Sequence, residues 1–174
     1  MRGLVPGDPA SLSALGASAT RASRELAAAC EASGTAYASL KDVWGTSTSV
    51  RVRKEGRRAL DALTVGGRHT EAVGAALQSY AVELSALQAR ARAVLDEASA
   101  AGITVEAGRA RLAWGVTGEA DAATTRGRAD TVAKVQAELD AVAAQHRRRR
   151  DRFLAEVAAS TTELEALARS LRVS

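Results

Sequence analysis

Residues 9–45, PASLSALGASATRASRELAAACEASGTAYASLKDVWG, carry the pattern that decides the fold. Apolar and small side chains recur every three or four positions from Leu12 to Trp44, which places them along one narrow stripe of a single helix. Pro9 suits the first helical position. Gly45 accepts the left-handed backbone that is common just past a helix end. The stretch therefore predicts one long helix, to about residue 42, that ends in a turn.

Two further helices follow from the same periodicity. The serines and threonines after Gly45 can cap a second helix from about Ser49 to Ser99, and a third is expected from about Arg128 to Arg169. The short connection between the first two helices makes them antiparallel. The predicted fold class is all-α, in three parts: an antiparallel helical hairpin over residues 1–100, a Gly-containing connecting segment over 101–127, and a long C-terminal helix over 128–174.

The connecting segment is expected to be the least helical stretch after the N-terminal arm, because glycines concentrate there. Each Gly in a helix interior costs ~1 kcal/mol relative to Ala. The two tryptophans, Trp44 and Trp114, are each followed by glycine. Trp44 continues the first stripe and is expected to close the end of the hairpin core, whereas Trp114 lies among glycines without a regular stripe.

Composition favours thin helical bundles over a wide globular core. The hydrophobic share of 47% is inflated by alanine, and aromatic residues make up only 3%. The net charge of +4 arises from 24 basic and 20 acidic residues that are mixed along the chain, as on solvated helix faces. The bias toward Ala, Arg and Gly suggests a GC-rich bacterial genome.

The sequence carries no recognisable active site. Cys30 is the only cysteine, and His69 and His146 are the only histidines and lie far apart, so neither a disulfide nor a metal site is expected. No phosphate-binding glycine motif occurs. The N-terminus lacks the apolar core of a signal peptide, and no stretch approaches the ~20 apolar residues of a membrane span. We expect a protein that is not an enzyme and binds no cofactor or metal.

The most conspicuous local feature is a run of four arginines, Arg147, Arg148, Arg149 and Arg150. Such a run could bind phosphate groups of nucleic acid. However, four successive helical residues point around nearly the whole helix, and no aromatic residues interleave for base stacking. A solvated or partner-facing helix surface is the favoured interpretation. The alternative is a basic coiled-coil protein of the nucleoid or division apparatus.

Three features together resemble the WXG family of type VII (ESX) secretion proteins, and most closely the N-terminal helical domains of actinobacterial type VII-secreted toxins. The opening residues 3–10, GLVPGDPA, look like the short leader of those domains. Trp44-Gly45 lies at the predicted hairpin turn, and the second helix carries Tyr80, Leu84 and Leu87 among Ala and Arg. The resemblance covers residues 1 to about 100.

Two departures qualify what the resemblance implies. The family turn is Trp-x-Gly, whereas here Gly45 follows Trp44 directly. The family's export signal, Tyr-x-x-x-Asp/Glu, is absent, because Lys41 follows Tyr37 at that spacing and Leu84 follows Tyr80. The chain also ends after a helix without a toxin domain, so we expect an accessory or partner protein whose binding partner supplies the signal.

The resemblance implies a type VII secretion-associated helical protein that acts as partner, targeting factor or small substrate. Its expected partner is another helical protein, in a homo- or heterodimer, such as a co-secreted toxin. Its expected location is the bacterial cytoplasm, with secretion, if any, by a route that needs no signal peptide. The partner seam is expected to contain Leu12, Leu15, Leu26, Leu40, Leu77, Leu84 and Leu87.

Overall fold

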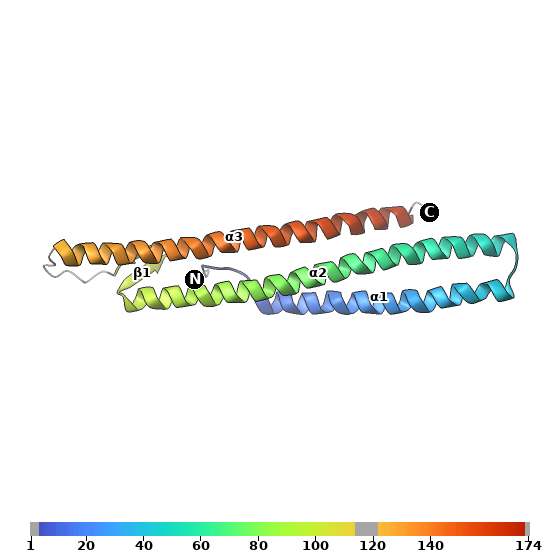
Figure 1. Ribbon diagram of the computed structural model, residues 1–174, viewed down its shortest axis with the longest axis horizontal. Helices are drawn as coiled ribbons and strands as arrows, with labels where there is room; N and C mark the ends of the chain where they lie inside the picture. The colour runs from blue at the N-terminus through green and yellow to red at the C-terminus, as the bar shows by residue number, and fades with distance from the viewer. Residues whose placement is uncertain (1–3, 114–121, 173–174) are drawn as a thin grey trace. The chain divides into compact units, whose positions relative to one another are not determined.

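The computed structural model describes residues 4–113 and 122–172, and it confirms the all-α prediction. Three helices, α1 (Pro9–Val43), α2 (Ser47–Ala100) and α3 (Ala122–Arg172), comprise 35, 54 and 51 residues and together exceed two thirds of the chain (Figure 1). They form the expected helical hairpin followed by a long third helix.

The turn between α1 and α2 follows the chemistry expected from its sequence. The Thr46 side chain caps α2 by accepting a hydrogen bond from the Ser49 amide at 3.4 Å. The Ser49 hydroxyl, which is fully buried, lies 2.7 Å from the carbonyl oxygens of both Trp44 and Thr46. The contact with Trp44 satisfies a carbonyl group just past the end of α1, where helical partners are lacking.

The helices contribute to two compact units. Unit 1 combines the N-terminal segment up to Pro9 with Tyr80–Asp151, and unit 2 combines Ala10–Ser79 with Arg152–Ser174. In unit 2, α1 runs antiparallel to the first part of α2 (Figure 1). The contacts thus divide the chain within α2 and within α3, and not at the connecting segment.

Unit 1 has a well-defined apolar core. Val94 and Ala98 of α2 pack with Ile103 and with Val135 and Leu139 of α3, and all five are at most 5% exposed. The stripe that the sequence predicted on the second helix supplies the α2 side of this core. The third helix therefore covers this part of α2 within the same chain.

The connecting segment is the least helical described stretch after the N-terminal arm, as expected, but it contains a β-hairpin that the sequence analysis did not predict. Strands β1 (Ile103–Glu106) and β2 (Arg109–Leu112) pair antiparallel. Gln136 of α3 holds the hairpin in place, because its side chain accepts a hydrogen bond from the Ala110 amide at 2.9 Å and donates one to the Gly108 carbonyl at 3.1 Å.

The turn of this β-hairpin offers a stability test. Ala107 has a φ of 50° and Gly108 a φ of 78°, the two positive values that a type I′ turn requires. A left-handed conformation costs an ordinary L-residue roughly 1–2 kcal/mol, and Asn tolerates it better. We expect Ala107→Asn to raise the free energy of unfolding by about 0.5–1 kcal/mol and Ala107→Val to lower it. A higher urea midpoint for Ala107→Val than for Ala107→Asn would contradict this turn assignment.

The N-terminal segment packs onto unit 1. Val5 is buried, and the Gln88 side-chain amide donates hydrogen bonds to the carbonyls of Val5 at 3.2 Å and Gly7 at 2.8 Å. A Cβ on Gly7 would lie 2.8 Å from a methyl group of Leu84, so the backbone lies directly on that side chain. The leader that suggested the family resemblance therefore covers part of the α2 stripe.

Candidate functional site

The two units differ in how well they bury apolar side chains, and this difference marks unit 2 as the candidate binding region. In the described part of the chain, every large apolar side chain that is buried belongs to unit 1. The buried residues of unit 2 are small: Gly16, Ser23, Ser49, Gly67, Gly74 and Ser160. Its exposed large apolar residues are Leu15, Trp44, Val50, Leu63, Leu154 and Leu171.

Close approach of α1 and α2 explains why unit 2 buries so little. A Cβ on Gly74 would lie 2.9 Å from the Gly16 carbonyl oxygen, and a Cβ on Gly16 would lie 2.8 Å from the Gly74 carbonyl oxygen. Further along, the Ser23 hydroxyl donates a hydrogen bond to the Gly67 carbonyl at 2.9 Å. The two backbones therefore meet through glycine and serine, which bury little apolar surface between the helices.

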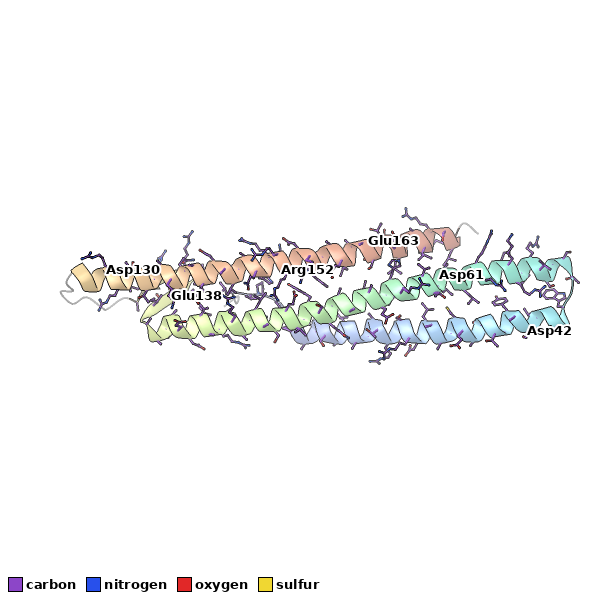
Figure 2. All side chains as sticks on the ribbon, in the orientation of Figure 1. Asp42, Asp61, Asp130, Glu138, Arg152 and Glu163 are labelled. Carbon is purple, nitrogen blue, oxygen red and sulfur yellow. The ribbon has the colours of Figure 1, made fainter. Side chains whose placement is uncertain are left out.

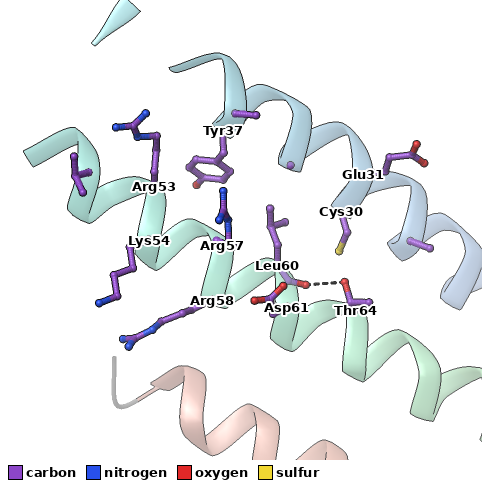
Figure 3. A pocket seen from close by; sticks show the side chains of 14 residues that line it. Cys30, Glu31, Tyr37, Arg53, Lys54, Arg57, Arg58, Leu60, Asp61 and Thr64 are labelled. Carbon is purple, nitrogen blue, oxygen red and sulfur yellow. Dashed lines mark hydrogen bonds between the residues drawn. The ribbon is translucent and has the colours of Figure 1, made fainter. Parts of the chain in front are cut away.

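A groove lies between α1 and α2 toward the hairpin turn, with a volume of about 980 Å³. Figure 3 shows Tyr37 of α1 and Leu60 of α2 within it. The Tyr37 ring lies on Gly56, since a Cβ there would be 2.7 Å from the ring. Val50 also lines the groove and is 55% exposed. The groove is therefore partly apolar and open to solvent.

Basic side chains flank this groove. Arg53 and Arg57 extend on the side of α2 that faces α1, and Lys54 and Arg58 extend on the other side (Figure 3). Arg53 Nε donates to the Ser49 carbonyl at 3.3 Å. No carboxylate of the described residues lies within ion-pairing distance of any of the four cations. Their charges are available to an external partner.

Elsewhere the charges are mixed along the helices, as the sequence predicted. Figure 2 shows Asp42 on α1 and Asp130 and Glu163 on α3, and all three side chains are exposed. Like the arginine run at 147–150, the cluster of cations at the groove departs from this mixed pattern. Sequence reasoning missed it, although residues 51–58 contain five basic residues and one acidic residue.

The predicted partner seam is split between the two units. Leu84 and Leu87 are 1% and 3% exposed within unit 1. Their surface is covered by the chain itself, so they are corrected from seam residues to core residues. Leu15 is 59% exposed on α1. The remaining four leucines of the predicted seam lie half-buried in unit 2: Leu12, Leu26, Leu40 and Leu77.

Trp44 lies at the predicted turn but does not close an apolar core there. It is 41% exposed, and it follows the last residue of α1. The expectation of a buried indole was wrong because the buried Ser49 hydroxyl, and not the indole, closes the turn. Gly45 directly follows Trp44 in the turn, and a Cβ added to Gly45 would meet nothing within 4 Å. The second tryptophan, Trp114, lies outside the described residues.

The arginine run behaves as a solvated helix surface with local ion pairs. Arg147 and Arg148 are exposed. Arg149 pairs with Glu83 of α2 at 3.7 Å, and Arg150 pairs with Asp151 at 2.8 Å. The four side chains diverge in this way because successive helical residues point in different directions.

His146, just before the run, is a buried side chain, which the sequence analysis considered only as a metal ligand and did not expect to be one. It is 8% exposed and lies 3.3 Å from the Tyr80 hydroxyl. Burial, reinforced by the positive charge of Arg150, lowers the pKa of His146, while Asp151 opposes this shift. Burial likewise raises the pKa of Tyr80. Both shifts favour the neutral pair.

This pair predicts a pH dependence of stability. Because the pKa of His146 is lowered in the folded chain, the unfolded chain binds more protons below its ordinary pKa of 6.5. The stabilisation that neutral His146 contributes is present above about pH 6.5, and it is lost as the pH falls toward the pKa of His146 in the folded chain. We expect the urea midpoint of the unchanged chain to decrease as the pH is lowered from 7.5 to 5.5. In His146→Gln this decrease should be smaller. An equally steep decline in His146→Gln would exclude this cause.

Other candidate chemistry is weak in the described ranges. No group of three or more His, Cys, Asp or Glu residues there could hold a metal ion. Cys30 is a half-buried free thiol that lines the groove, and His69 is half-buried on α2. None of the described helices is long and apolar enough to cross a membrane.

Comparison with known proteins returns no relative. No family model, no curated protein and no solved structure matches this chain. Its functional interpretation therefore depends on the groove, the exposed apolar residues of unit 2 and the turn.

Proposed function

We propose that this chain is a type VII (ESX-like) secretion-associated helical protein that binds a helical partner through unit 2. In this proposal it serves as a partner or targeting factor for an exported protein, or is itself a small substrate. It acts in the bacterial cytoplasm before any export. The Trp44-Gly45 turn and the leader before α1 support the family resemblance on which the secretion role rests.

One observation carries the binding role: unit 1 buries most of its large apolar side chains, whereas unit 2 buries none of those described and leaves six of them exposed. Leu15, Val50 and Leu63 are 59%, 55% and 38% exposed. Singly exposed apolar residues are normal, but a unit whose buried residues are all small has an incomplete core. A partner helix laid on α1 and α2 would complete it.

The energetics allow such a complex. Apolar surface removed from water stabilises by roughly 25 cal/mol per Å², and stable complexes bury about 1,600 Å² in total. Ordering and rigid-body entropy offset most of this gain. The exposed leucine and valine side chains of unit 2 would supply part of the apolar surface that such a complex buries.

The experiment is co-purification from the native host with the tagged full-length chain as bait, followed by mass spectrometry. The partner is then purified and mixed with the chain. Leu15→Glu with Leu63→Glu places two carboxylates on the exposed face, and burying them without cations is costly. The matched control is Val82→Glu, a residue of unit 1 that is 71% exposed. Circular dichroism must show each variant folded.

We expect a helical secretion protein or an exported toxin as partner, loss of the complex with the Glu pair, and a normal complex with Val82→Glu. Export of the partner to the medium should also depend on the chain. A chain with the four arginines of 147–150 changed to Gln should keep its partner. The nucleoid alternative would be established if the partners are DNA or DNA-bound proteins and only the Gln variant loses them.

A further inference from the structure

A local surplus of positive charge lies in the segment of α2 that lines the groove. Residues 51–58, RVRKEGRR, have five cations and one carboxylate, a surplus of four, which equals the net charge of +4 of the whole chain. The rest of the chain is therefore balanced. The arginine run has an equal local surplus, because residues 147–152, RRRRDR, have five cations and one carboxylate, but Arg149 and Arg150 form ion pairs there.

The groove that these cations flank has an apolar floor. Tyr37, Leu60 and Val50 line it together with small side chains of α1, including Ala27 and Ala38. The floor is half-buried to exposed, so it can gain by being covered. The four cations all lie on α2, so the floor has one cationic edge, and this matches a ligand with an apolar stripe and acidic residues along one side of it.

The length of the groove also fits a helix. Its lining residues run from Ala27 to Ala38 on α1 and from Val50 to Thr64 on α2. At ~1.5 Å per residue the α2 side spans roughly 20 Å. This is the length of an amphipathic helix of three to four turns, and such a helix presents apolar side chains every three or four residues.

We propose that the groove binds an acidic amphipathic helix of the partner protein, whose apolar stripe covers Tyr37 and Leu60 and whose carboxylates face Arg53, Lys54, Arg57 and Arg58. This inference rests on the proposed function, because it gives the chemistry of the partner helix. Charge complementarity selects the partner and speeds its association, and the apolar floor holds it. The groove also contains two acidic residues, Glu31 and Asp61. The ligand must therefore place basic or neutral side chains opposite these two carboxylates.

The test uses the full-length chain and a synthetic amphipathic helix of about four turns with a leucine stripe flanked by glutamates. A second peptide has Gln in place of each Glu, and short duplex DNA is the third probe. Cys30, the only cysteine, lines the groove and reports on its occupancy through its rate of alkylation by iodoacetamide. Binding is measured by fluorescence anisotropy at low and high salt.

We expect the acidic peptide to bind and to slow alkylation of Cys30 several-fold. The Gln peptide should bind about tenfold more weakly than the acidic peptide, and high salt should weaken binding of the acidic peptide by about the same factor. Changing Arg53, Lys54, Arg57 and Arg58 to Gln should weaken binding similarly. The matched control, Gln at 147–150, should leave it unchanged. Equal binding of both peptides, no protection of Cys30, or protection by DNA but not by the acidic peptide would overturn the inference.

The failure of this inference differs from failure of the proposed function. If the acidic peptide fails to protect Cys30 while the co-purified partner still depends on Leu15 and Leu63, the groove chemistry is wrong and the partner role stands. If the peptide protects Cys30 but no helical partner is recovered from the host, the groove chemistry stands and the secretion role is wrong.

Discussion

Leu84→Ala should lower the free energy of unfolding of the isolated chain by about 3–5 kcal/mol. Leu84 is only 1% exposed, and the backbone at Gly7 lies on its side chain. Truncation therefore removes buried apolar contacts and leaves a cavity. Urea unfolding followed by circular dichroism measures the change.

The matched control is Leu15→Ala, which truncates a leucine that is 59% exposed on α1. Exposed substitutions usually change stability by less than about 0.5 kcal/mol, so we expect a nearly unchanged midpoint for the isolated chain. Similar midpoints for the two variants would mean that Leu84 lies at an open seam and not in a completed core. The opposite ranking is expected for partner binding, where Leu15 contributes and Leu84 acts only through folding.

Gly74→Ala should destabilise the chain, although alanine is the better helix former. A Cβ at this position would lie 2.8 Å from the Thr20 hydroxyl and 2.9 Å from the Gly16 carbonyl oxygen, so α1 must move. Overpacking costs about 1–3 kcal/mol, which exceeds the ~1 kcal/mol gained in helix propensity. We expect a net loss of up to about 2 kcal/mol in the free energy of unfolding.

Gly127→Ala is the control, because an added Cβ on this glycine of α3 meets nothing within 4 Å. Only the propensity term remains, so the variant should gain about 0.5–1 kcal/mol. The two substitutions are chemically identical and should differ in sign. Stabilisation by both would show that α1 and α2 do not approach closely at Gly74.

The helices could be predicted because their signals are local. The spacing of apolar residues after Pro9, the run of serines and threonines after Gly45 and the scarcity of proline gave all three, with ends within a few residues except at the start of α3. The sequence also placed the turn correctly. These features depend on periodicity and capping, which act over a few residues.

The parts that could not be predicted depend on contacts between distant segments. The β-hairpin at Ile103–Leu112 is held by Gln136, more than twenty residues away, and its turn uses Ala107 where Asn-Gly would have been recognised. His146 is buried because Tyr80 lies opposite. Leu77 and Leu84 belong to the same predicted stripe, yet tertiary packing assigns them to different units.

The groove shows a different limit. Its cations could have been found by counting charge in short windows, since 51–58 contains five basic residues and one acidic residue. Its apolar floor could not, because Tyr37 and Leu60 come together only when α1 and α2 pack. Sequence periodicity predicted that a seam exists but could not say which leucines the chain covers for itself.

Hydrogen exchange on the isolated chain tests most directly the claim that unit 1 has a completed apolar core, whereas the core of unit 2 is completed only by a bound partner. Amide protection reports the free energy of local opening, which is low where few apolar contacts are buried. We predict slow exchange in Tyr80–Ala100 and around Leu139, faster exchange across Ala10–Ser79, and slowing of the latter when the partner is added. Equal protection of both regions in the isolated chain would contradict the account.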